Sequence, residues 1–418
     1  MQYYSYIPCS LFDIFIYYFF ANVILVWDNT MLSDLESKNN KSPDKKNSNN
    51  NINNNNNNNN KTDIIQNILD GAQSQFPPIA PELDFQRLIA ADKNRPLDER
   101  IEAFEDIIDS EIGDTNLTRA RNIEREFGIR QIFLKFEGTT PTGTQKDRIA
   151  FAQVMDALRR GYDTVTVATC GNYGAAISLA ASIAGINCEI YIPETYHTSR
   201  IKEIEDNGAK IIRIPGDYEN AVKISQDNAD NKEYYDANAG GENTMIQFRA
   251  YGEIAYEIYD ELRDAPAVIA LPVSNGTTLA GIYKGFLSLY RRGKTSKMPR
   301  IVAGSSFGKN PIIQAFLKNL NTCEDLSPEK IHETAINEPL INWRSIDGDY
   351  ALEAIRETGG WGAYATDKNM LYFSKLLREK EGLSILPAST AGLIALIERH
   401  KTNPLPNDRY VIILTGRK

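Results

Sequence analysis

The chain has 418 residues, of which 42% are hydrophobic and 24% charged, a balance typical of a soluble globular protein with room for two full cores. Its formal net charge of -9 argues against nucleic-acid binding, which usually requires a basic face. The four cysteines form no CxxC pair and the three histidines show no metal-ligand spacing, so we expect a reducing compartment and no bound metal.

Residues 1–74 are predicted to lie outside the folded part of the protein. Residues 1–27 are apolar and aromatic, but Asp13 lies among them and no Lys or Arg precedes Lys38, so the charged start of a secretory signal is missing. They are open to three interpretations: a membrane signal anchor, a disordered leader, or an extension upstream of a true start at Met31, which we favour. Residues 38–61 are rich in Asn, Lys and Ser, a composition that predicts disorder.

From residue 75 onward, the apolar pattern predicts helices that alternate with short buried strands. We expect helices at residues 97–110, 116–127, 148–160, 174–184, 198–207 and 218–229. We expect strands at residues 131–136, 164–168, 188–192, 210–214, near 234, and at 268–271, 301–304 and 410–414. Strands and helices in this alternation form βαβ units on a parallel sheet, so the fold is predicted to be α/β with two sheets facing a cleft.

Lys146 has an unusual position in this pattern. An extended run ends in a turn rich in Gly, Thr and Pro, where Thr142 and Thr144 are suitable helix caps, and Lys146 then falls in the first turn of a helix. Cations are disfavoured at this end of the helix dipole. Such a lysine is suited to act as an amine of lowered pKa that forms a Schiff base, and the alternative is a solvated surface lysine.

Three further segments follow predicted strands, where ligands bind in open parallel sheets. The loop 169–174 and the loop 274–278 each combine Gly with polar residues and open a helix, which suits an anion. An ordinary strand-to-helix turn and a plain helix cap are the alternatives. The third segment is Leu414-Thr415-Gly416-Arg417-Lys418.

Several motifs resemble those of fold-type II pyridoxal-phosphate enzymes, and those of the threonine synthase family most closely. PTGTQKDR, at residues 141–148, resembles PTGSFKDR of this family. TCGNYG at 169–174 is similar to SSGNTG, SNGTT at 274–278 to the phosphate loop, and LTGRK to LTGHGLK. The segment 335–343, which contains Asn-Glu-Pro and Trp343, resembles IxxGNPxSW. The resemblance covers about residues 85–418.

The resemblance assigns roles to residues of this chain. Lys146 would carry pyridoxal 5'-phosphate covalently and act as the catalytic base. The remaining cofactor contacts would be Asn172, Ser274, Asn275, Gly276, Thr277, Thr278 and Thr415, with Thr415 at the pyridine nitrogen. The substrate would contact Thr169, Cys170, Tyr173 and Arg249. Arg249 would bind the phosphate of O-phosphohomoserine, and its alternative interpretation is an arginine on a helix surface.

The resemblance also implies a fold and a function. The fold would be α/β of fold-type II, with two open parallel-sheet three-layer domains around a central cleft. A large cofactor-binding domain would comprise residues 75–145 and 242–418, and a small domain residues 146–241. The activity would be that of a cytoplasmic, homodimeric lyase that converts O-phosphohomoserine and water to threonine and phosphate.

Other functions stay open, because the chain departs from the family pattern at Thr140, Gln145, Glu253 and Leu386. The alternatives are a serine/threonine dehydratase, a cysteine synthase-like enzyme, or a catalytically silent paralogue.

Overall fold

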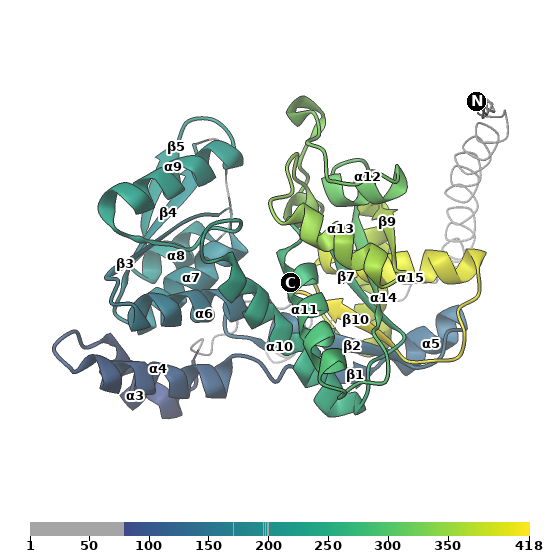
Figure 1. The fold of residues 1–418 in the computed structure, drawn as a ribbon, viewed down its shortest axis with the longest axis horizontal. Helices are drawn as coiled ribbons and strands as arrows, with labels where there is room; N and C mark the ends of the chain where they lie inside the picture. The colour runs from purple at the N-terminus through teal and green to yellow at the C-terminus, as the bar shows by residue number, and fades with distance from the viewer. Residues whose placement is uncertain (1–78, 170, 195, 197, 199) are drawn as a thin grey trace, which may run out of the picture. The chain divides into compact units, whose positions relative to one another are not determined.

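Two sheets organise the chain in the computed structural model, which describes residues 79–418 except 170, 195, 197 and 199 (Figure 1). The described residues all belong to one compact unit. The expectations for residues 1–74 and for Cys170 lie outside the described residues. Within the described part, no helix is both long enough and apolar enough to cross a membrane.

The larger sheet has six strands, and every neighbouring pair is parallel except β1 and β2. Its strand order is β1 (Leu117–Arg119), β2 (Ile132–Phe136), β10 (Tyr410–Leu414), β7 (Val268–Pro272), β8 (Arg300–Ser306) and β9 (Trp361–Ala365).

The smaller sheet has four parallel strands, which all fall within residues 146–241. Its strand order is β5 (Lys210–Ile214), β4 (Asn187–Pro193), β3 (Thr164–Ala168) and β6 (Tyr235–Asp236).

Helices cover both faces of each sheet. The helices before β7 are α3 (Asp84–Ala91), α4 (Leu97–Glu111), α5 (Arg121–Phe127), α6 (Lys146–Arg159), α7 (Asn172–Ile183), α8 (Ile201–Asp206), α9 (Tyr218–Lys232) and α10 (Thr244–Leu262). Those after it are α11 (Thr277–Arg291), α12 (Pro311–Leu317), α13 (Gly348–Glu357), α14 (Asp367–Glu381) and α15 (Ala391–Thr402). Short 3-10 helices are η1 (Pro81–Leu83), η2 (Glu137–Thr139), η3 (Pro328–Lys330), η4 (Glu338–Leu340) and η5 (Pro387–Thr390). In the smaller sheet, α9 packs on one face and α6 and α7 on the other (Figure 1).

Strand β10 shows how the larger sheet separates two hydrophobic layers. Successive side chains of a strand point to opposite faces. Val411 and Ile413 accordingly join the core that contains α11 and α13, whereas Ile412 and Leu414 join the core that contains α14 and α15. All five residues of β10 are buried, which explains the continuous apolar run in its sequence.

Three expectations from the sequence need correction. The segment 116–127 is not one helix, because β1 pairs antiparallel with β2 before α5 begins at Arg121. Strand β9 was not predicted, because its sequence WGAYA lacks β-branched residues. Helix α6 begins at Lys146, and neither Thr142 nor Thr144 is its N-cap. The Thr142 hydroxyl instead donates to Asp147 Oδ1 at 2.7 Å.

Candidate active site

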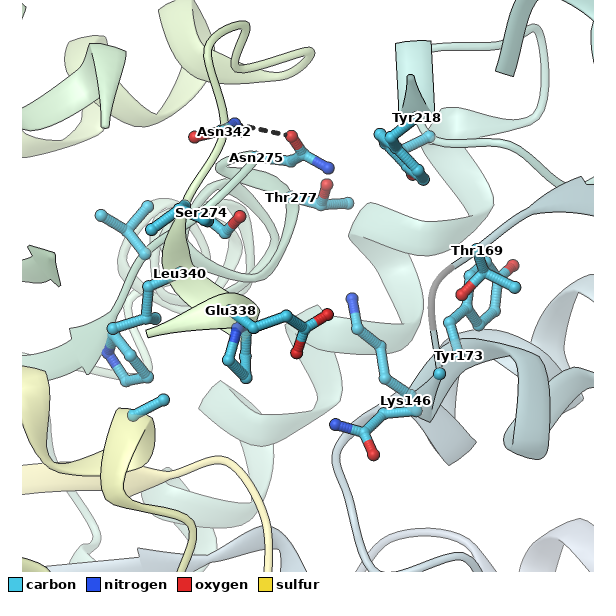
Figure 2. A pocket seen from close by; sticks show the side chains of 18 of the residues that line it. Lys146, Thr169, Tyr173, Tyr218, Ser274, Asn275, Thr277, Glu338, Leu340 and Asn342 are labelled. Carbon is cyan, nitrogen blue, oxygen red and sulfur yellow. Dashed lines mark hydrogen bonds between the residues drawn. The ribbon is translucent and has the colours of Figure 1, made fainter. Parts of the chain in front are cut away.

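A cavity of about 540 Å³ lies where strands of both sheets end. Its walls include the loops that follow β3, β7 and β10, together with the first turn of α6 and the segment 338–343 (Figure 2). The carboxyl ends of parallel strands are where this fold class binds ligands, so the cavity is the candidate active site.

Lys146 extends into this cavity from the first position of α6 (Figure 2). Burial lowers the pKa of its amine from 10.5 to about 8, while the negative charge of Asp347 opposes this shift. Nζ lies 5.8 Å from the centre of the Tyr173 ring. Near neutral pH a usable fraction of the amine is therefore unprotonated and able to attack a carbonyl carbon.

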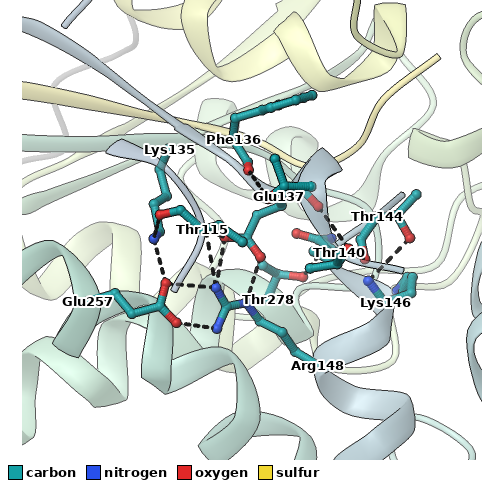
Figure 3. Close-up of polar contacts among 12 residues, drawn as sticks. Thr115, Lys135, Phe136, Glu137, Thr140, Thr144, Lys146, Arg148, Glu257 and Thr278 are labelled. Atoms are coloured by element: carbon teal, nitrogen blue, oxygen red, sulfur yellow. Dashed lines mark hydrogen bonds and ion pairs between the residues drawn. The ribbon is translucent and has the colours of Figure 1, made fainter. Parts of the chain in front are cut away.

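Below the start of α6, a buried cluster of charges anchors the helix (Figure 3). Arg148 Nε lies 2.6 Å from Glu137 Oε2, and Arg148 Nη1 lies 2.6 Å from Glu257 Oε1. Lys135 pairs with Glu257 as well, so two cations face two carboxylates. Burial alone would lower the pKa of Arg148, but the two glutamates outweigh burial and raise it. The cluster ties α6 to β2 and α10, and sequence reasoning did not identify it.

The loop 274–278 leads into α11 and places polar side chains at the N-terminus of this helix. Gly276 has a φ of +99°, and an added Cβ would lie only 2.7 Å from the Asp347 backbone oxygen, so a larger residue does not fit. Thr277 Oγ1 donates to Asp347 Oδ2 at 2.5 Å, and Asn342 Nδ2 donates to Asn275 Oδ1 at 2.9 Å (Figure 2). Ser274 and Thr278 complete the loop, and all five of its residues line the cavity.

On the opposite wall, Thr169, Asn172 and Tyr173 line the cavity around the start of α7. Asn172 Oδ1 accepts a hydrogen bond from Arg200 Nη1 at 2.8 Å, which fixes the amide. The Tyr173 hydroxyl donates to the Ala237 backbone oxygen at 3.0 Å, so the ring stays beside Lys146.

Thr415 lines the cavity at the end of β10. Its hydroxyl lies 2.8 Å from the Ser389 hydroxyl, and its backbone oxygen accepts from Gln145 N at 2.9 Å. Arg417 N donates to the Gly143 backbone oxygen at 2.9 Å. The segment after β10 thus holds the turn that carries Lys146.

The structure does not bring Arg249 to the cavity. Arg249 is exposed on α10, whereas Gln247, two residues earlier, lines the cavity. Residues two apart on an α-helix point about 200° away from each other, so both cannot face the same space.

Sequence reasoning missed the acidic side chains of the cavity. Four carboxylates line it: Asp217, Glu219, Glu333 and Glu338. Burial raises the pKa of Glu219 to about 7 and also raises that of Glu338. Among the residues that the structure describes, Lys146 is the one Lys or Arg in the lining. No local pattern marked these carboxylates, although Glu338 lies within the Asn-Glu-Pro segment.

The arrangement fits a cofactor that bears both an aldehyde and a phosphate group. An amine of lowered pKa meets the first requirement, and a helix N-terminus with hydroxyl side chains meets the second. Thr415 adds a further hydroxyl-bearing side chain to the lining.

Comparisons with known proteins agree with this chemistry. The family described as pyridoxal-phosphate dependent enzyme matches residues 108–416. A threonine synthase of Methanocaldococcus jannaschii is 30% identical over 72% of this chain and 74% of that relative. One of Mycobacterium tuberculosis is 30% identical over 68% of this chain and 76% of that relative.

Solved structures share the fold at lower identity. Maize serine racemase is 18% identical with a TM-score of 0.62, covering 76% of this chain and 93% of its own. Diaminopropionate ammonia lyase from Escherichia coli is 16% identical with a TM-score of 0.62, covering 82% and 91%. The fold-type II prediction is thereby confirmed, and the chain belongs to the pyridoxal-phosphate dependent enzymes.

Proposed function

We propose that this pyridoxal-phosphate-dependent lyase converts O-phosphohomoserine and water to threonine and phosphate. The observation that carries the proposal is the Lys146 amine, whose pKa is lowered to about 8 inside a cavity flanked by two helix N-termini. The threonine synthases that match two thirds or more of the chain support this substrate.

The residues of the cavity divide into those that hold the cofactor and those that hold the substrate. We assign the cofactor phosphate to the loop 274–278, the ring nitrogen to Thr415 and the ring oxygen to the amide of Asn172. When bound, pyridoxal phosphate withdraws electrons from the α-carbon of the amino acid. Lys146 would remove protons at the α-carbon and the β-carbon while the bond between the γ-carbon and the phosphate oxygen breaks, and it would return a proton to the α-carbon after water has bonded the β-carbon. Thr169, Tyr173 and the start of α7 face the substrate carboxylate, and the predicted contact of Cys170 lies outside the described residues.

A serine/threonine dehydratase is the second candidate, and the charge of the cavity favours it. Of the charged side chains that the structure describes, four carboxylates and Lys146 line the space, and Arg249 lies outside it. Carboxylates disfavour a nearby phosphate dianion but accept hydrogen bonds from a hydroxyl group.

Product analysis tests the proposal directly. The purified holoenzyme is incubated with O-phosphohomoserine, L-serine or L-threonine, and amino acids, phosphate and 2-oxoacids are measured. Threonine and phosphate in equal amounts from O-phosphohomoserine are the expected result. Formation of pyruvate or 2-oxobutyrate, without conversion of O-phosphohomoserine, would select the dehydratase instead.

Attachment of pyridoxal phosphate to the apoprotein should report the lowered pKa of Lys146. The unprotonated amine is the reactive form, so the attachment rate should rise with pH with a midpoint near 8. Because the charge of Asp347 raises this pKa, Asp347→Asn should move the midpoint to lower pH. The exposed Asp349→Asn is the matched control and should not shift it. The rate is followed by absorbance, and a wild-type midpoint near 10.5 would contradict the assignment.

A further inference from the structure

Glu338 enters the cavity from the side opposite Lys146. It is the first residue of η4, and its side chain and that of Lys146 point into the same space (Figure 2). Glu338 immediately precedes Pro339, the place where the motif IxxGNPxSW has Asn. A carboxyl group in place of an amide adds a group that can take up and release a proton.

The backbone around Glu338 is held in place. Glu338 N donates to the Thr334 backbone oxygen at 3.0 Å, and the buried Asn337 side chain donates to Asp367 Oδ1 at 3.2 Å. The side chain is oriented as well, since the Tyr196 hydroxyl donates to Glu338 Oε1 at 2.6 Å. Tyr196 belongs to the loop after β4, so the contact joins the two sides of the cavity.

Among the described residues, no cation is paired with the Glu338 carboxyl group to explain its place in the fold. The Glu338 side chain is half-buried, and acidic side chains that are removed from water are normally paired with a cation. Within the described part of the chain, no Lys or Arg forms an ion pair with Glu338. Burial is the main cause that raises its pKa, the Tyr196 hydrogen bond opposes this, and the negative charge of Glu333 adds to it. The other titratable side chains of the lining, among the residues that the structure describes, are Lys146, Tyr173, Asp217, Tyr218 and Glu219.

We propose that Glu338 is a further catalytic residue, which moves the proton of the oxygen that joins or leaves the β-carbon of the substrate. The inference rests on the proposed function. As a water oxygen uses one electron pair to bond the β-carbon, its O–H bond breaks and the proton passes to Glu338. The pair displaced from the carbon–carbon double bond moves to the α-carbon, which Lys146 protonates. Glu338 then releases its proton to solvent.

The same geometry serves the dehydratase, because that reaction breaks the bond that threonine synthase forms. Glu338 would then give its proton to the departing hydroxyl group, which leaves as water. In both directions, proton transfer at the α-carbon is separated from proton transfer at the β-oxygen, because Lys146 and Glu338 come from opposite walls (Figure 2).

The test compares two proton transfers in Glu338→Gln. Turnover of O-phosphohomoserine should fall about 10²–10⁴-fold, the contribution of one positioned acid or base. Exchange of the substrate α-hydrogen in D2O, measured by NMR, should persist because Lys146 performs it. The wild-type kcat should decline as the pH falls through the pKa of Glu338, and this decline should be absent in Glu338→Gln. Glu338→Asp should recover part of kcat.

Two further variants sharpen the result. Tyr196→Phe removes a hydrogen bond that lowers the pKa of Glu338, so the acidic decline of kcat should move to higher pH. Glu329→Gln removes an exposed carboxylate from the neighbouring η3 and should leave kcat unchanged. Equal loss of α-hydrogen exchange and product in Glu338→Gln, or an unchanged kcat, would overturn the proposal.

Failure of the proposed function would be recognised separately. If the wild type converts only serine or threonine, the same variants are compared on that substrate. Glu338 must then be protonated to donate its proton, so kcat should decline as the pH rises through its pKa. That outcome would refute the threonine synthase assignment while supporting the role of Glu338. A wild type that converts none of these substrates would refute both.

Discussion

Replacing Lys146 with Ala should reduce kcat by at least about 10²–10⁴-fold, the contribution of a single positioned acid-base group. The expected loss is larger than this minimum, because the same amine also attaches the cofactor. Each factor of ten corresponds to about 1.4 kcal/mol of transition-state stabilisation. Formation of the threonine or 2-oxoacid product measures the effect.

The Lys146→Ala protein should still bind pyridoxal phosphate without a covalent bond, through Asn172 and the loop 274–278. Dialysis should therefore remove the cofactor from the variant more readily than from the wild type. Lys294→Ala, in an exposed turn, is the matched control and should keep full activity. Wild-type turnover in Lys146→Ala would place the chemistry elsewhere.

Replacing Arg148 with Met should lower the free energy of unfolding by about 3–5 kcal/mol, the usual cost of breaking a buried ion pair. The Arg148 side chain is only 3% exposed and contacts both Glu137 and Glu257. Without it, Lys135 stays in the cluster with the buried carboxylate of Glu137 and the half-buried carboxylate of Glu257. Urea unfolding of the cofactor-loaded enzyme measures the change.

Helix α6 supplies a matched control for this substitution. Arg159 lies 2.6 Å from Glu105, but both side chains are 50% exposed. Exposed pairs of this kind contribute no more than about 1 kcal/mol. Arg159→Met should therefore change the unfolding free energy far less than Arg148→Met, and equal effects would contradict the role of the buried cluster.

The sequence sufficed for the parts of the molecule that local patterns determine. Strands β3, β5 and β10 were predicted with the bounds that the structure gives them, because short apolar runs between turn signals indicate strands. Lys146 and the loop 274–278 follow strand ends, and parallel sheets bring such ends together.

The remaining features depend on contacts between distant segments. Arg148 and Glu257 are 109 residues apart, and no local pattern predicts that they meet. The family resemblance assigned Arg249 to the substrate phosphate, but its position on α10 relative to Gln247 turns it away from the cavity. Asp347 meets Thr277, and Glu338 enters the cavity beside Tyr196, only because distant loops pack beside the start of α11 and the loop after β4.

The place of β10 in the larger sheet has a consequence for biosynthesis. This strand lies between β2 and β7, although it comes last of the three in the sequence. During translation, β2 and β7 leave the ribosome before the strand that joins them exists, so the edges that β10 later covers stay without this partner until β10 has been made. Pairing over such long sequence separations is also slow. Nascent chains of this enzyme should therefore depend on chaperones until β10 has been released.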